Sequence, residues 1–139
     1  MTNAVNVAAQ TVAANSPVLF ASNRFQTGGC LCCAASSHEP GTGIVNLRQP
    51  GIYQVTFTGN ISTTAAGEAI INIQANGVDI TGAQATVTTA ADTNYAVSIS
   101  TLVQVCCNDT VAISVENGST VPVTVTDANI IVTRLPKGA

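Results

Sequence analysis

The longest regular pattern in this chain of 139 residues is the stretch Tyr95–Val105, with the sequence YAVSISTLVQV. Apolar and polar side chains alternate along it with a period of two. One set of alternate positions holds the apolar members Tyr95, Val97, Ile99, Val103 and Val105. A β-strand points successive side chains to opposite faces, whereas a helix repeats a face about every 3.6 residues. The stretch therefore predicts a strand that has one face in a core.

The same alternation recurs on both sides of this stretch. It occupies the segments Ile52–Thr58, Ala69–Ala75, Val111–Glu116 and Val121–Thr126. Pairs that form turns separate these segments, because Gly and Asn tolerate positive φ: Pro50-Gly51, Asn76-Gly77, Asn108-Asp109 and Asn117-Gly118. Short strands with such turns indicate an antiparallel sandwich or barrel.

Two residue signals refine this interpretation. Asn76-Gly77 lies between two apolar runs and predicts a tight hairpin. Pro122 has no N–H for a ladder, so its strand is expected to be short or at an edge of the sheet. Neither a linker nor a repeat divides the chain. We expect one domain over residues 1–139, with an N-terminal strand segment at 1–20 and a Cys-rich loop at 28–43.

Composition supports a β protein and excludes several functions. Hydrophobic residues make up 46% of the chain and charged residues only 8%, against about a quarter in typical soluble domains. Thr and Val fit pleated, half-buried strands. With four basic residues and a net charge of −3, the chain is not expected to bind nucleic acid. No run approaches the roughly 20 apolar residues that span a bilayer, so no membrane segment is expected.

The last strand-like segment, Ala128–Leu135, is apolar on both faces. Ile130 and Val132 occupy one face, and Ile131 and Leu135 occupy the other. Burial on both faces favours contact with another subunit. The alternative is that this is an end strand covered by the N-terminal segment Val5–Val12.

Four blocks, in order, resemble the globular heads of the tumour necrosis factor and complement superfamily, which has bacterial and phage members. They lie within about residues 44–135. The blocks are Leu47–Phe57 with its Pro-Gly-x-Tyr-x-Val-x-Phe pattern, Ile71–Gly77, Leu102–Val105 with Asn108–Val111, and Ala128–Leu135. Cys106-Cys107 departs from the family, which usually has small residues there. No collagen-like stalk sequence precedes the domain.

The resemblance implies an all-β jelly-roll sandwich of about ten antiparallel strands. It also implies a tight homotrimer assembled around the first and last strands. Together with the doubly apolar final segment, it predicts a trimer interface that includes Val5, Val7, Ile131 and Leu135.

Catalysis is not expected from this sequence. The single histidine, His38, lies in a Ser/Pro/Gly-rich stretch that predicts a solvated loop, although a pair with Cys30 or Cys33 is conceivable. The acidic residues are scattered, and all except Glu116 are expected at turns or loops. No phosphate-binding glycine loop is present, and no cofactor is predicted.

The cysteines form two groups, Cys30/Cys32/Cys33 and Cys106/Cys107. Three interpretations stay open. The five cysteines are candidates for a four-ligand zinc site, although the usual two-residue gap between ligands is absent and adjacent cysteines in an extended chain point to opposite faces. Reduced cysteines could pack as small apolar residues. Disulfides could join the groups, with Cys32 or Cys33 bonded to Cys106 or Cys107, because the resemblance places the second group at an end of the sandwich.

Two functions are compatible with these features. The first is a non-enzymatic structural protein of a phage or prophage virion, such as a capsid decoration or head-fibre unit, in contact with a capsid or other assembly protein. The second is a receptor- or glycan-binding head of a phage tail or of a spore or cell surface. Few aromatic residues are left for stacking on sugars, which favours the structural function.

Overall fold

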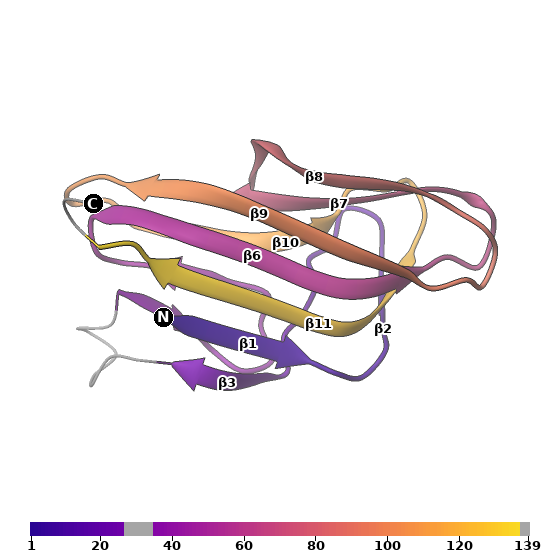
Figure 1. Ribbon diagram of the computed structural model, residues 1–139, viewed down its shortest axis with the longest axis horizontal. Helices are drawn as coiled ribbons and strands as arrows, with labels where there is room; N and C mark the ends of the chain where they lie inside the picture. The colour runs from indigo at the N-terminus through magenta and orange to yellow at the C-terminus, as the bar shows by residue number, and fades with distance from the viewer. Residues whose placement is uncertain (27–34, 137–139) are drawn as a thin grey trace.

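The computed structural model describes residues 1–26 and 35–136, which form two antiparallel β-sheets packed face to face (Figure 1). Within these ranges there is no helix, and hence none that could span a membrane. The strands are β1 (Thr2–Asn6), β2 (Gln10–Val12), β3 (Ser22–Gln26), β4 (Ser36–His38), β5 (Val45–Leu47), β6 (Gly51–Ser62), β7 (Gly67–Ala75), β8 (Val78–Thr89), β9 (Tyr95–Val105), β10 (Val111–Asn117) and β11 (Val123–Arg134).

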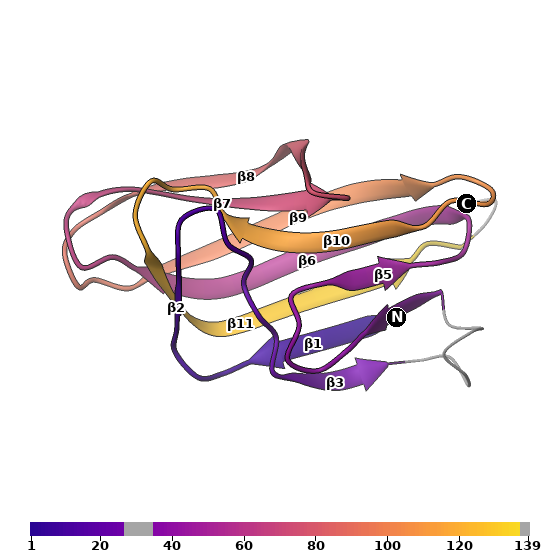
Figure 2. The same ribbon diagram turned by 180° about the vertical axis from the view of Figure 1, so that it is seen from behind.

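The strands divide between a six-stranded and a five-stranded sheet. The first has the order β3-β1-β11-β6-β9, with β2 also paired to β11, and the second has the order β4-β5-β10-β7-β8. Figure 1 shows the six-stranded sheet in front, and Figure 2 shows β5 and β10 in front of it. The all-β sandwich that the sequence predicted is confirmed. The described residues hold eleven strands rather than about ten, because short strands such as β4 carry no alternating pattern.

The alternation in the sequence corresponds to the inner and outer faces of the sheets. β6 and β9 pair over their length, from Gly51 opposite Val105 to Ile61 opposite Tyr95. Their inward side chains form much of the core between the sheets: Tyr53, Val55, Phe57, Ile61, Val97, Ile99, Val103 and Val105. Burial of an aromatic or large aliphatic side chain contributes about 1.5–3 kcal/mol, so these two strands supply a large share of the folding free energy.

The hairpin predicted at Asn76-Gly77 is confirmed. Ala75 pairs with Val78, so the turn between β7 and β8 has two residues. Asn76 has a φ of 51° and Gly77 a φ of 79°. Positive φ at both central positions is the backbone of a type I′ turn, whose twist matches that of paired strands.

The expectation for Pro122 was wrong. β11 begins directly after it, at Val123, and runs for 12 residues between β1 and β6. It is therefore long and central. Pro122 precedes the strand and needs no ladder hydrogen bond. The two apolar segments that the sequence showed near the C-terminus are one strand, joined through a bulge at Asp127.

The suggestion that Val5–Val12 covers an end strand was also wrong. β1 pairs with β11 edge to edge, with Ala4 opposite Ile130, and β2 pairs with β11 near Val125. The N-terminal segment thus extends the sheet beside β11. Ile130 and Val132 are buried between the sheets, whereas Ile131 is 37% exposed on the outer side.

Candidate functional site on the six-stranded sheet

On the outer surface of the six-stranded sheet, the outward-facing positions of β1, β6, β9 and residues 129–133 of β11 carry no charged side chain. We call this surface the uncharged face. Its side chains alternate with the buried ones, and they are Asn3, Val5, Ile52, Gln54, Thr56, Thr58, Asn60, Ala96, Ser98, Ser100, Leu102, Gln104, Asn129, Ile131 and Thr133. Depletion of charge is typical of the central part of protein–protein interfaces.

Large apolar side chains project from one part of this face. Ile52 is 46% exposed and Leu102 is 60% exposed, in addition to Ile131. They are close in register. Ile131 lies opposite Thr56 on β6, and Leu102 lies opposite Gln54, which is two residues before Thr56. Exposed apolar side chains gathered on one surface usually mark an interaction site.

Two pairs of polar side chains on the face bond to each other, Asn3 with Asn129 and Thr56 with Ser100. The Asn3 carboxamide donates to Asn129 Oδ1 and, over 3.0 Å, to the Ile130 carbonyl, which fixes β1 beside β11. The hydroxyl groups of Thr56 and Ser100 form a hydrogen bond between β6 and β9, with their oxygens 3.2 Å apart. Polar groups that already have partners cost less to remove from water. The face is therefore suited to burial.

The structure brings three of the four predicted interface residues to this region. Val5 and Ile131 lie on the face, and Leu135 follows β11, where its N–H donates to the Ile52 carbonyl over 2.8 Å. Val7 lies beyond the end of β1 and is 71% exposed. Sequence reasoning missed Ile52 and Leu102. The sequence pattern could have identified Leu102 as an interface residue. The other outward-facing residues of Tyr95–Val105 are small or polar, and Leu102 is the large apolar one among them.

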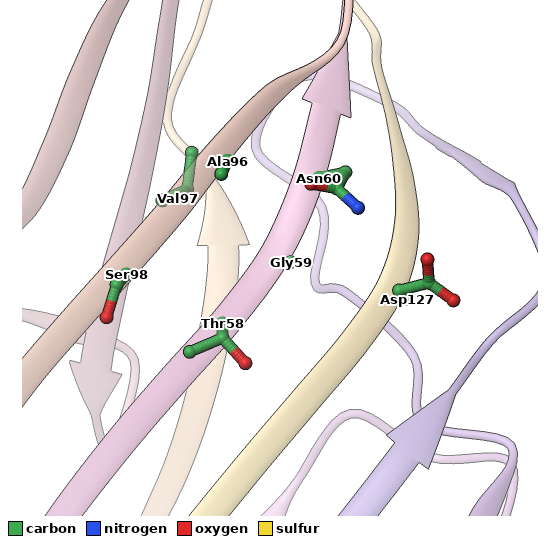
Figure 3. Close-up of a pocket in the computed structure, with 7 residues that line it drawn as sticks. All are labelled: Thr58, Gly59, Asn60, Ala96, Val97, Ser98 and Asp127. Carbon is green, nitrogen blue, oxygen red and sulfur yellow. The ribbon is translucent and has the colours of Figure 1, made fainter.

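A hollow of about 330 Å³ lies on the same face, where β6 ends and β9 begins (Figure 3). It is lined by Thr58, Gly59, Asn60, Ala96, Val97, Ser98 and Asp127. In Figure 3 the Asn60 carboxamide and the Thr58 hydroxyl point toward β11, the strand that carries Asp127. Among the described residues, the side chains of Thr58, Asn60, Ser98 and Asp127 have no hydrogen-bond partner. The hollow therefore combines a mostly apolar exposed lining with four polar side chains that are open to solvent.

Asp127 stands at the bulge of β11. Thr126 pairs with Asn60 and Asn129 pairs with Thr58, so Asp127 and Ala128 together oppose Gly59. Asp127 has a φ of 54°, in the left-handed region. A bulge of this kind turns a side chain out of the regular alternation and is frequent beside functional sites. Asp127 is the one carboxylate at the hollow.

The prediction that His38 lies in a solvated loop was wrong. His38 ends β4, within the segment expected to be a loop, and is 4% exposed. Its Nδ1 bonds to Asn23 Oδ1, and its Nε2 donates to the Thr42 carbonyl over 2.8 Å. Its ring packs edge-on against Phe20, with centroids 6.0 Å apart. His38 is thus a structural residue that ties β3, β4 and the following turn together.

Tyr53 forms a second buried polar link. Its hydroxyl donates to the Gln49 carbonyl over 2.7 Å and lies 3.2 Å from the Ala35 carbonyl. Burial raises the pKa of Tyr53, while the Gln49 hydrogen bond and the Arg134 charge act in the opposite direction. The tyrosine joins β6 to Ala35, the residue directly before β4.

The cysteine predictions concern residues that the structure describes only in part. Cys106 and Cys107 are exposed in the turn between β9 and β10. Cys30, Cys32 and Cys33 lie outside the described residues. Within residues 1–26 and 35–136, no group of three His, Cys, Asp or Glu side chains could hold a metal ion. Glu68 and Asp79, expected at turns, lie in β7 and β8.

Comparison with solved structures shows close likeness over the whole chain. The globular domain of zebrafish complement 1qA protein has a TM-score of 0.70 at 13% identity, covering 97% of this chain and 96% of that one. Eiger TNF of S. frugiperda has 0.65 at 12%, covering 99% and 94%. PRD1 vertex protein P5 has 0.57 at 15%, covering 97% and 96%. No protein-family model and no curated protein matches the sequence.

These likenesses show that the chain has the tumour necrosis factor-like jelly-roll fold. The fold that the four sequence blocks predicted is thereby confirmed.

Proposed function

We propose that this protein is a non-enzymatic structural protein that assembles as a homotrimer through the uncharged face. The carrying observation is the face itself: it combines exposed Ile52, Leu102 and Ile131 with the bonded polar pairs Asn3–Asn129 and Thr56–Ser100. Burial of the three apolar side chains contributes favourable free energy.

The edge of the six-stranded sheet offers a second contact surface beside the face. β9 ends this sheet, and its 11 residues include no charge and no proline. An unprotected edge of that kind is usually covered. Contact between the β9 edge of one copy and the face of the next joins unlike surfaces, which form a closed ring when the rotation between copies closes. The family resemblance implies a ring of three.

A non-enzymatic function agrees with the chemistry of the described residues. His38 is the single histidine of the sequence, and both of its ring nitrogens are engaged inside the fold. It is therefore not available as a general base.

We place the trimer in a phage or prophage virion, as a capsid decoration or head-fibre unit in contact with a capsid protein. The support is that a vertex protein of the phage PRD1 has the same fold along nearly its whole length. Mass spectrometry of density-purified particles from the source cells should detect the chain in stoichiometric amount. Its absence from such particles would contradict this location.

Light scattering on the purified protein tests the assembly. The expected mass is three times the chain mass of 14.0 kDa at micromolar concentration. A single-chain mass at that concentration would rule out the trimer.

The alternative function is a receptor- or glycan-binding head on a phage tail or on a spore or cell surface. The observation that favours it is the hollow beside Asp127, where the polar side chains of Thr58, Asn60, Ser98 and Asp127 have no partner within the described part of the chain.

A further inference from the structure

The charged side chains of the described residues are divided between the two ends of the sandwich. Figure 1 shows a molecule elongated along its strands, with the β6–β7, β8–β9 and β10–β11 connections at one end and the β5–β6 and β9–β10 connections at the other. Four carboxylates lie in or beside the first three connections, and no described basic side chain does. We call this the acidic end, and its carboxylates are Glu68, Asp92, Glu116 and Asp127.

The described basic side chains all lie toward the opposite end, which we call the basic end. Arg48 directly precedes the turn into β6, Arg134 ends β11, and Arg24 lies in β3 next to Phe25, which pairs with Asn3 near the start of β1. Asp109, in the β9–β10 turn, is the one described carboxylate at this end. The other two described carboxylates, Glu39 and Asp79, lie between the ends.

These charges are not neutralised within the described part of the molecule. Arg134 donates to the Pro50 carbonyl and, over 3.1 Å, to Gln49 Oε1, which holds the guanidinium at the end of β11 on neutral acceptors. Neither Arg134 nor Arg24 forms an ion pair with a described residue, and neither do the four carboxylates of the acidic end. The two ends therefore present fields of opposite sign to the solvent.

A cleft at the acidic end fits one kind of side chain. It has a volume of about 270 Å³ and lies between the β6–β7 and β10–β11 connections. Ala65, Ala66, Val121 and Pro122 give it apolar walls, and Glu68 is the one charged group in its lining. An arginine combines an apolar stem with a charged head that a carboxylate can bind through two hydrogen bonds. The cleft therefore suits an arginine side chain from outside the molecule.

We infer that the acidic end of one copy docks on the basic end of another copy, with an arginine entering the cleft beside Glu68. The partner is a second copy because this chain carries both complementary surfaces. The contact joins unlike surfaces from opposite ends of an elongated molecule, so it extends into an open linear array rather than closing as a pair. This docking goes beyond the structural role proposed above and does not depend on the trimer.

The strength of this contact should depend on salt. Single exposed ion pairs are weak, and their attraction reaches about 30 Å at 0.01 M salt but only about 3 Å at 1 M. The chain has a net charge of −3, so copies without oriented contacts repel each other most at low salt. Growth of particles at low salt is therefore diagnostic of docking between opposite ends.

The test is light scattering on the purified full chain at about 0.01 M and about 1 M salt. We expect the mass at low salt to be at least about twice the mass at high salt. Equal masses at the two salt concentrations would overturn the inference. The mass at high salt reports the trimer separately: a single-chain mass there, with growth at low salt, would uphold the docking and contradict the trimer.

Glu68→Lys and Glu39→Lys separate the docking from a general effect of charge. Both residues are exposed, and both substitutions change the net charge by the same amount toward zero. Glu68→Lys should abolish the growth at low salt although it weakens the overall repulsion between copies, whereas Glu39→Lys should retain the growth. Growth that persists in Glu68→Lys, or that disappears in both variants, would refute docking at the acidic end.

Discussion

His38 shows how much a single buried polar side chain contributes to this fold. Replacing it with alanine removes two hydrogen bonds and an aromatic contact, and leaves the Thr42 carbonyl without its donor. Loss of buried hydrogen bonds and packing of this kind costs about 1–3 kcal/mol. We expect His38→Ala to lower the melting temperature by several degrees, measured by calorimetry. Ser98→Ala, at an exposed position, is the control, and equal melting temperatures in the two variants would contradict the role given to His38.

Tyr53 should make stability depend on pH in the alkaline range. Because burial raises its pKa in the folded chain, the folded state holds the hydroxyl proton more tightly than the unfolded state, whose tyrosine titrates near pH about 10. This contribution is fully present below that pH and is lost as pH rises through the raised pKa. We expect denaturant unfolding to show stability falling above pH about 10. Tyr53→Phe should reduce this alkaline loss, and an unchanged loss in that variant would contradict the role of Tyr53.

At the scale of elements, the sequence predicted the long strands, but it did not predict the short strand β4 or the bulge within β11. The period-two runs at Ile52–Thr58 and Tyr95–Val105 gave the inner face of β6 and β9, because each strand buries one side. β4 has three residues, too few to show a period, so His38 was assigned to a loop. The bulge at Asp127 shifts the alternation by one residue, which made β11 look like two strands. The hollow arises at that bulge and left no pattern in the sequence.

Residues 35 and 105, which the structure describes and which flank the two cysteine groups in the sequence, are each linked to the segment 48–51. Cys106 follows Val105, which pairs with Gly51, and the Arg48 N–H donates to the Ala35 carbonyl over 2.9 Å, just after the Cys-rich segment. We therefore keep the prediction of a bridge from Cys32 or Cys33 to Cys106 or Cys107. A loop of about 75 residues closed in this way adds a few kcal/mol of stability in the chain-entropy model. Non-reducing peptide mapping should find the bridge. Five free thiols in air-exposed protein, or stoichiometric zinc, would rule it out.

At the scale of the whole molecule, the proposed assembly should fail when a charge enters the uncharged face. Ile131→Asp would place an unpaired carboxylate in a dry interface. A buried charge without a partner destabilises such an interface by about 3–5 kcal/mol. We expect this variant to elute and scatter as a monomer with the fold retained, because Ile131 is 37% exposed in the single chain. Val78→Asp is the matched control, since Val78 is 69% exposed in the other sheet. A trimeric Ile131→Asp protein would show that another surface is used.

The central position of β11 sets the order in which the parts of this molecule can form during synthesis. All members of the five-stranded sheet, from β4 to β10, precede β11 in the chain, whereas β1 and β6 have no common neighbour until β11 arrives. A nascent chain that stops at Pro122 can complete one sheet, and it leaves β1 and β6 apart. The surface that carries Ile131 and the bulge of Asp127 therefore exists only once β11 has been synthesised and has paired with β1 and β6. Any binding that uses this surface must wait for that last strand of the sandwich.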